Sequence, residues 1–263
     1  MARAAKSTLK TNGRRTDAGD TASLPGSFGG FGPKALDFFR ALDFHQNRDW
    51  FVENKDLYER DVKAPMAALI ADLAALFAAR GVPLRGDPKS SMFRLNRDVR
   101  FSKDKRPYKT HAGAVLTRDG TKTMLGLLYI HIDPAGPFVA AGFYQPQPDA
   151  LFALRAAIRD RPDAFAAVEK ELAGAGLTLD RSDALTRLPR GFDGVAPDSP
   201  AAAAIKLRSL IARRAIEPDQ IFRPDLTARI ASFAEEALPL LRFGWSAIDT
   251  AKGQAMAAVA EAE

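Results

Sequence analysis

Cationic side chains gather in one stretch of the sequence, between residues 93 and 111, where Asp, Ser and Tyr are interspersed with them. The wider segment 85–111 holds nine Lys or Arg against three Asp, although the net charge of the whole 263-residue chain is only +6. Guanidinium groups bind phosphate or carboxylate through paired hydrogen bonds, and ammonium groups add positive charge. We therefore predict a site for an anionic, phosphate-bearing small ligand on a basic strand-loop motif over residues 94–109. The candidate ligand-binding residues, including three from later segments, are Arg94, Arg97, Asp98, Arg100, Ser102, Lys103, Asp104, Lys105, Tyr108, Lys109, Tyr129, His131 and Tyr144.

The first half of this motif alternates in the manner of a β-strand, in which neighbouring side chains point to opposite faces. The apolar positions that would share a packed face are Phe93, Leu95, Val99 and Phe101. On the opposite face, Asp98 would lie within reach of Arg100 and hold its guanidinium plane. Arg97 falls in register with the apolar face, which indicates a bulge, an edge or a buried ion pair. Pro107 and the preceding Ser and Asp residues predict a loop after residue 101.

Two other interpretations of the motif stay open. It could be a nucleic-acid surface, which would require a broad positive stripe with exposed aromatic side chains. It could also be an internal ion-pair network in a scaffold or interaction domain without a ligand, since ion pairs are abundant in proteins with no active site. A compact ligand would instead require a concave site on which Arg side chains converge.

Other chemistries have little support in the sequence. His45, His111 and His131 stand far apart and lack the His-x-x-x-His spacing of a helical zinc site, so no metal site is predicted. Asp98 and Asp104 are the only carboxylates embedded in the motif, and the cations beside them would neutralise them, which argues against two-metal phosphodiester chemistry. No Cys occurs, which excludes thiol catalysis and disulfides. No phosphate-binding loop, nucleophile elbow or dinucleotide-binding turn occurs, so no cofactor is predicted.

The same motif resembles the signature of the DUF2461 family, conserved proteins whose biochemical role has not been established. Its central residues are Arg97-Asp98-Val99-Arg100-Phe101-Ser102-Lys103-Asp104-Lys105, followed by Pro107-Tyr108-Lys109. The resemblance also takes in Asn47 to Phe51, Asn54, Lys55, Tyr58, Tyr129, His131, Gly142 to Tyr144, Pro146, Leu154, Arg155, Leu188 to Phe192 and Lys206. It spans residues 31–243. It implies a common fold but brings no catalytic residues with it.

Three helices are predicted before the motif. Pro33 opens the first, and Asn47 is an N-cap for the second. The third runs from Pro65 to Arg80 and ends at Gly81.

Segments 112–117, 123–132 and 138–144 then predict an antiparallel strand meander. Its core face would carry Leu128, Ile130, Val139, Ala141 and Phe143. Its other face would carry Tyr129, His131, Ala140, Gly142 and Tyr144. Small residues beside polar aromatic ones leave a shallow concavity, which could form the floor of a site. The alternative is a face covered by a helix, with His131 hydrogen-bonded inside.

Helices are predicted for residues 148–160 and 162–172, a strand for 205–214, and a last helix for 224–241 with a kink at Pro239. This order indicates an α+β fold, an antiparallel sheet meander flanked by N-terminal and C-terminal helices, in a single domain over residues 31–245. Residues 1–30 are predicted to be a disordered basic tail, and residues 246–263 a flexible Ala-rich tail.

Composition adds expectations about location. No apolar run in the sequence reaches the roughly 18 residues that span a bilayer, and the N-terminus lacks a signal-peptide core. A cytoplasmic protein that does not bind membranes is therefore expected. The sequence does not indicate an oligomeric state.

Overall fold

The structure is a computed structural model that describes residues 27–260, with side chains described to residue 257. The predicted disordered tail therefore lies mostly outside the described residues. Its last residues belong to the folded part, because Phe28 is only 4% exposed and packs in the core. The backbone N–H of Phe28 also donates to the Asp72 carboxylate at 2.6 Å. The folded part thus begins before residue 31.

The N-terminal helices form where local signals placed them. They are α1 (Ala35–Phe44), α2 (Arg48–Glu53), α3 (Lys55–Tyr58), the π-helical turn η1 (Glu59–Lys63) and α4 (Ala64–Arg80). The Asn47 side chain accepts a hydrogen bond from the Trp50 N–H at 2.9 Å and so caps α2 as predicted. Gly81 has a φ of 66°, the left-handed conformation with which helices end at glycine.

The sheet is a four-stranded antiparallel meander in the order β1-β2-β3-β4. Its strands are β1 (Ala112–Thr117), β2 (Leu127–Ile132), β3 (Phe138–Phe143) and β4 (Leu210–Ala215). The predicted core face is confirmed, since Leu128, Ile130 and Phe143 are each at most 1% exposed. The strand predicted for 205–214 is partly wrong. Ser199 caps a short helix, α7 (Pro200–Ile205), in the Ala-rich run, and the strand begins only at Leu210.

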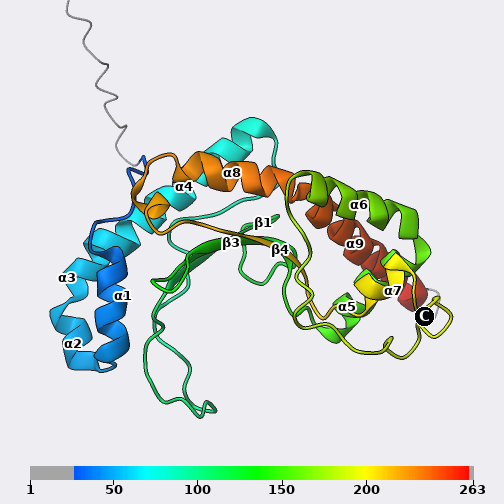
Figure 1. Cartoon of the computed structure of the whole chain (residues 1–263), viewed down its shortest axis with the longest axis horizontal. Coiled ribbons are helices and arrows are strands. Elements are labelled where there is room, and N and C mark those ends of the chain that lie inside the picture. The colour runs from blue at the N-terminus through cyan, green and yellow to red at the C-terminus, as the bar shows by residue number, and fades with distance from the viewer. Residues whose placement is uncertain (1–26, 261–263) are drawn as a thin grey trace, which may run out of the picture.

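The remaining elements are α5 (Pro148–Asp160), α6 (Pro162–Gly174), the 3₁₀ turn η2 (Gln220–Phe222), α8 (Leu226–Glu236) and α9 (Leu238–Ala260). Figure 1 shows α4 and α8 along one side of the sheet, α1 to α3 beyond one end, and α5, α6, α7 and α9 beyond the other. On β2, side chains are alternately buried and half-buried, with Tyr129 and His131 among the half-buried ones. The predicted α+β fold in one body is confirmed.

One helical stretch of the described chain, Lys55–Arg80, is long and apolar enough by length and composition to cross a membrane. Five of its α4 side chains, Met66, Leu69, Ile70, Leu73 and Phe77, are fully buried in the core. Core helices of folded domains have this composition as well.

The C-terminal helix corrects another expectation. The flexible tail predicted from residue 246 is helical, because α9 continues to Ala260. Its first half is anchored: the Trp245 indole N–H donates to the Leu125 carbonyl at 3.0 Å, and Ile248 is 7% exposed. The predicted kink at Pro239 appears as the break between α8 and α9 at Ala237.

Two truncations test which part of α9 contributes to the stability of the protein. Ending the chain after Lys252 should leave the free energy of unfolding nearly unchanged, because the described side chains beyond it are exposed. Ending it after Gly244 should cost about 3 kcal/mol or more, since it removes the buried Trp245 and Ile248. Urea unfolding of both truncated proteins measures the difference, and equal midpoints would contradict the packing of α9.

Candidate functional site

The cationic motif is a long loop and not a strand, so the strand predicted for residues 93–101 is wrong. Its two limbs pair with each other, since the Arg97 N–H donates to the Pro107 carbonyl and the Lys109 N–H to the Leu95 carbonyl, and only the start of the loop pairs with the sheet, where the Phe93 N–H donates to the Gly113 carbonyl; all three bonds are 2.8 Å. Phe101, expected on the packed face, is 95% exposed. In Figure 1 the loop is the long excursion between α4 and β1 that extends away from the sheet.

Ion pairs within the loop engage the arginines of its tip, residues 97–106, where two aspartates stand against five Lys or Arg. Asp98 pairs with Arg100 at 2.7 Å, as the spacing predicted, and Asp104 pairs with Arg97 at 2.6 Å and with Arg106 at 2.9 Å. Arg97 is therefore a member of an ion pair, but the pair is partly exposed and not the buried one considered for it. Hydrogen bonds from Arg106 and Arg97 hold the pKa of Asp104 well below its usual range.

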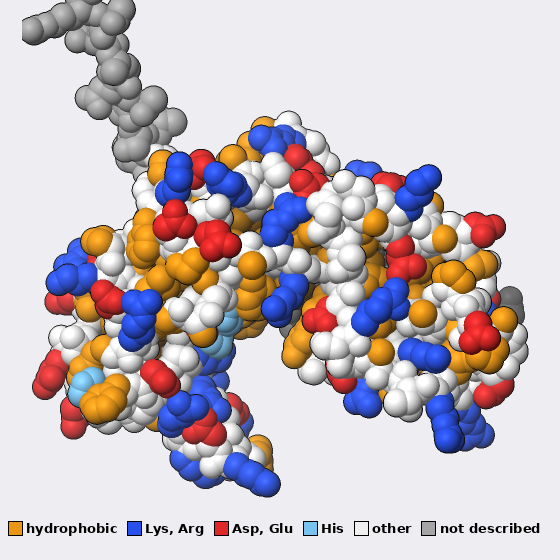
Figure 2. Space-filling view, in the orientation of Figure 1, with side chains coloured by type: hydrophobic (Ala, Val, Ile, Leu, Met, Phe, Trp, Pro, Cys, Tyr) orange, Lys and Arg blue, Asp and Glu red, His pale blue; other side chains and the backbone are white. Residues whose placement is uncertain are grey.

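Further bonds stiffen the loop. Arg106 also reaches Asp43, at 2.8 Å, and the Lys105 ammonium donates to the Val99 carbonyl at 3.0 Å. Lys103 is exposed and Ser102 half-buried, and neither has a hydrogen-bond or ion-pair partner among the described residues. The space-filling view shows red and blue side chains side by side on this projection (Figure 2).

The base of the loop, by contrast, carries cations without acidic partners. The ammonium groups of Lys109 and Lys122 lie 5.3 and 5.2 Å from the centroid of the Phe93 ring. Burial, together with the positive charges of Arg94 and Lys122, lowers the pKa of Lys109. Within residues 27–257, no carboxylate forms an ion pair with any of these three cations, and Arg94 acts electrostatically on Asp98, which Arg100 already binds. We call Arg94, Lys109 and Lys122 the basal cluster.

Polar aromatic side chains lie beside the basal cluster on the half-buried face of the sheet. The Tyr129 hydroxyl lies 2.9 Å from His131 Nδ1, and the His131 ring stacks on Phe138 with centroids 4.5 Å apart. Phe93 meets the edge of Tyr129 at 6.3 Å, which connects this face to the cluster. The guanidinium of Arg213 lies 5.2 Å from the centroid of Phe138.

Small residues lie beside the aromatic ones on this face. Gly113 is paired with His131, and a Cβ at Gly113 would stand only 2.8 Å from the Tyr129 hydroxyl. Ala140 is paired with Tyr129 on the other side. Figure 2 shows a notch in the lower edge of the molecule, beneath the sheet. The Tyr129 side chain covers Gly113, and the shallow floor expected from the sequence stays a prediction.

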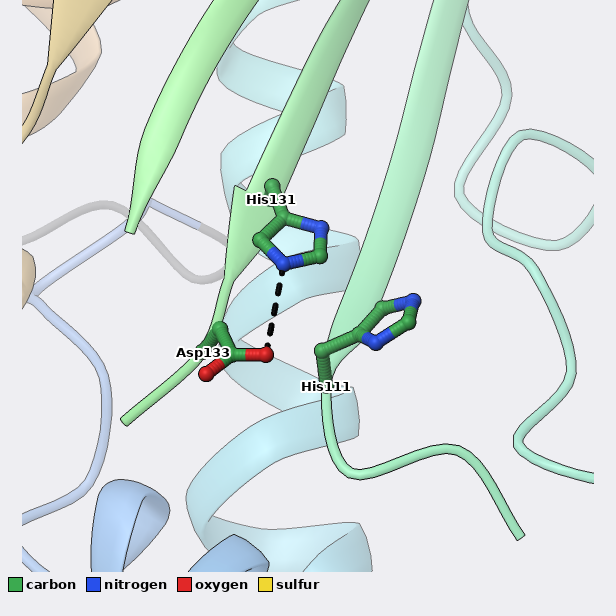
Figure 3. A group of neighbouring side chains, drawn as sticks. All are labelled: His111, His131 and Asp133. Carbon is green, nitrogen blue, oxygen red and sulfur yellow. Dashed lines mark ion pairs between the residues drawn. The ribbon is translucent and has the colours of Figure 1, made fainter. Parts of the chain in front are cut away.

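At the edge of this face the strand register brings three potential metal ligands together. Ala112 pairs with Ile132, so His111 and Asp133 flank the same end of the β1–β2 ladder. His131 Nε2 lies 3.4 Å from an Asp133 oxygen, and the rings of His111 and His131 are 4.3 Å apart (Figure 3). Burial lowers the pKa of both histidines, that of His111 to about 4, so both are neutral at pH 7.

The two remaining predicted tyrosines lie elsewhere. Tyr108 is 5% exposed and stacks on Phe51 with ring centroids 4.7 Å apart, so its ring packs in the core. Tyr144, just beyond β3, is 63% exposed and influences the electrostatics of Tyr129. The structure thus divides the predicted residues among a loop tip whose arginines are paired with aspartates, a basal cluster, the half-buried sheet face with the exposed Tyr144 beyond it, and the core.

Sequence reasoning missed four residues that the structure places at the sheet face: Lys122, Arg213, His111 and Asp133. His111 and Asp133 were accessible in principle, because the predicted meander aligns the start of one strand with the end of the next. Lys122 belongs to a polar turn and had no local signal.

The fold and the site define a class: an α+β protein with helices packed on one side of an antiparallel meander and a half-buried polar face, flanked by cations, on the other. Comparison with protein families matches residues 34–243 to DUF2461, described as a conserved hypothetical protein. The chain belongs to the DUF2461 family. No curated protein and no solved structure matches it.

Proposed function

We propose that the half-buried face of the sheet binds a compact anionic ligand, of which a phosphate-bearing small molecule is the simplest example. The observation that carries this proposal is the basal cluster, in which two ammonium groups approach one aromatic ring without a carboxylate partner in the described chain. Like charges held together repel one another, and a bound anion relieves that repulsion.

The division of charge within the loop supports this location over the loop tip. Arg97, Arg100 and Arg106 are each paired with an aspartate, so a ligand would have to compete with an aspartate for these arginines, and only Lys103 and Lys105 of the tip have no carboxylate partner in the described chain. Arg94, Lys109 and Lys122 have no such partner among the described residues. A phosphate beside Phe93 would meet these cations and the hydroxyl of Tyr129, the mixed cationic and hydrogen-bonding environment that phosphate prefers.

The loop tip supports nucleic-acid binding as a second candidate function. Phe101 is 95% exposed and the Arg100 guanidinium lies 5.9 Å from its ring. An exposed aromatic ring next to cations can stack on an unpaired base. Binding of this kind would depend steeply on salt, whereas a compact site would depend on it weakly.

Replacing the basal lysines tests the first proposal. Lys109→Met and Lys122→Met keep the aliphatic stems and remove the charges. The ligand-free Lys109→Met protein should be as stable as the wild type or more stable, whereas Lys122→Met also loses the bond from the ammonium to the Met92 carbonyl at 2.6 Å and should cost about 1 kcal/mol. Inorganic phosphate at 100 times its dissociation constant should stabilise the wild type by about 2.7 kcal/mol. This stabilisation should be absent from both variants when thermal unfolding is measured.

Lys103→Met is the matched control, because Lys103 lies on the same loop but outside the basal cluster. Its response to phosphate should equal that of the wild type. A response lost equally in all three variants would mean that net charge, and not this site, attracts the anion. Binding confined to an oligonucleotide, lost in Phe101→Ala and steep in salt, would favour the second candidate.

A further inference from the structure

We infer that His111, His131 and Asp133 form a binding site for a divalent transition metal ion of the Zn²⁺ or Fe²⁺ class. Each residue offers one ligand atom, and these atoms all lie within 4.8 Å of one another. Two imidazoles and one carboxylate are a ligand set that both ions accept, with coordination positions left over for water or substrate. This inference does not depend on the anion proposal.

The distances suit coordination with little movement. Zinc–nitrogen and zinc–oxygen bonds of about 2.0–2.2 Å place tetrahedral ligand atoms roughly 3.3 Å apart. His131 Nε2 and the Asp133 oxygen are already 3.4 Å apart. Only His111 has to approach the other two, and its ring faces that of His131 at a centroid distance of 4.3 Å (Figure 3).

The scaffold holds the three groups together without a ligand. His131 is on β2, Asp133 follows that strand directly, and His111 precedes β1, so the hydrogen-bonded ladder between Ala112 and Ile132 fixes their separation. The other carboxylate oxygen of Asp133 accepts a hydrogen bond from the Ala135 N–H at 2.7 Å, which fixes the side chain.

Tyr129 fits the role of a partner outside the metal's own ligands. Its hydroxyl lies 2.9 Å from His131 Nδ1, on the opposite side of the ring from the nitrogen that faces Asp133. When Nδ1–H donates to this hydroxyl, the lone pair of Nε2 is free for the metal. Metal-bound histidines almost always have such a second hydrogen bond, which fixes the tautomer and the ring orientation.

Burial and charge agree with metal binding. The side chains of His131 and Asp133 are 14% and 21% exposed, so the site is accessible to an ion but mostly shielded from water. Beside the imidazoles of His111 and His131, the Asp133 carboxylate supplies negative charge to a bound cation. Arg213 and Lys109 act on these histidines as neighbouring positive charges, which would favour an anion as the additional metal ligand.

The test is metal titration of the full chain after removal of metal with a chelator. Isothermal titration calorimetry with Zn²⁺, and visible absorption with Co²⁺, should show one saturable site in the wild type. His111→Ala, His131→Ala and Asp133→Asn should each weaken binding at least tenfold. Tyr129→Phe should weaken it by about tenfold through loss of the supporting hydrogen bond.

His45→Ala is the matched control, since it removes the third histidine of the chain, which stacks on Trp50 away from the sheet. It should bind metal like the wild type. Circular dichroism of each variant tests whether it is folded. Asp133→Asn is the variant expected to disturb the fold least, because it retains an oxygen that accepts from the Ala135 N–H. Absence of saturable binding in the wild type would overturn the inference. So would binding that survives both His111→Ala and Asp133→Asn, or binding lost in His45→Ala.

Discussion

Gly142→Ala is expected to destabilise the protein by about 3 kcal/mol or more, because it combines backbone strain with a steric clash. Gly142 has a φ of 134°, a conformation that residues with a side chain rarely adopt. A Cβ there would overlap the carbonyl oxygen of Leu210 in β4. The clash is with the backbone of a paired strand, so relief requires β3 and β4 to separate. Urea unfolding measures the loss.

Gly136→Ala is the control for this substitution. Gly136 lies in the turn between β2 and β3, where a Cβ would meet no atom within 4 Å and the φ is ordinary. Its unfolding midpoint should stay close to that of the wild type. A Gly142→Ala protein as stable as Gly136→Ala would contradict the pairing of β3 with β4.

Ile130→Ala is expected to cost about 2–5 kcal/mol, the usual range for emptying a well-packed core position. Ile130 is fully buried on β2, paired with Ala114 on one side and Val139 on the other.

Phe101→Ala removes a larger side chain from a position whose sequence pattern also predicted packing. Because Phe101 is 95% exposed, its removal should change the free energy of unfolding by less than about 0.5 kcal/mol.

Chemical denaturation of Ile130→Ala and Phe101→Ala measures both losses. The structure confirms the predicted burial of Ile130 and corrects the predicted burial of Phe101. A loss above about 1 kcal/mol for Phe101→Ala would indicate that the loop packs on the domain. A loss below that value for Ile130→Ala would show that the sheet faces are reversed.

Helix ends and strand faces of the meander could be predicted from the sequence because they depend on local chemistry. Asn47 caps α2 by accepting a hydrogen bond from Trp50, three residues further on, and Gly81 ends α4 through its own left-handed backbone conformation. The alternation through Leu128 and Ile130 was interpretable because turn residues bounded the strand on both sides.

Where the prediction failed, the deciding interactions were distant in sequence. The alternation over 93–101 is the same for a strand of the sheet and for a loop limb that pairs with its own return limb. Beyond the bond from Phe93 to Gly113, the bonds of this limb go to Pro107 and come from Lys109. The segment after residue 246 has no sustained apolar stripe, yet Trp245 holds α9 by a bond to a residue 120 positions earlier.

The candidate site was predictable in part for the same reason. The composition of the sequence locates the positive charge in the loop. Which of these cations form ion pairs depends on which aspartates lie opposite them in the folded loop. The pairing of Asp104 with both Arg97 and Arg106 engages two arginines of the tip, whereas no carboxylate of the described chain forms an ion pair with the basal cluster. Spacing along the chain separates His111 from His131, whereas the register of β1 and β2 brings them together.

The central claim is that an anion binds at the half-buried sheet face beside the basal cluster and not at the loop tip. The most direct test is a titration of the wild type with inorganic phosphate at constant ionic strength, followed by ¹H–¹⁵N nuclear magnetic resonance. Saturable shifts are predicted at the amides of Gly113, Tyr129 and Lys109, with those of Arg100 and Lys103 unchanged. Saturable shifts confined to residues 98–106, or shifts that never saturate anywhere, would contradict the account.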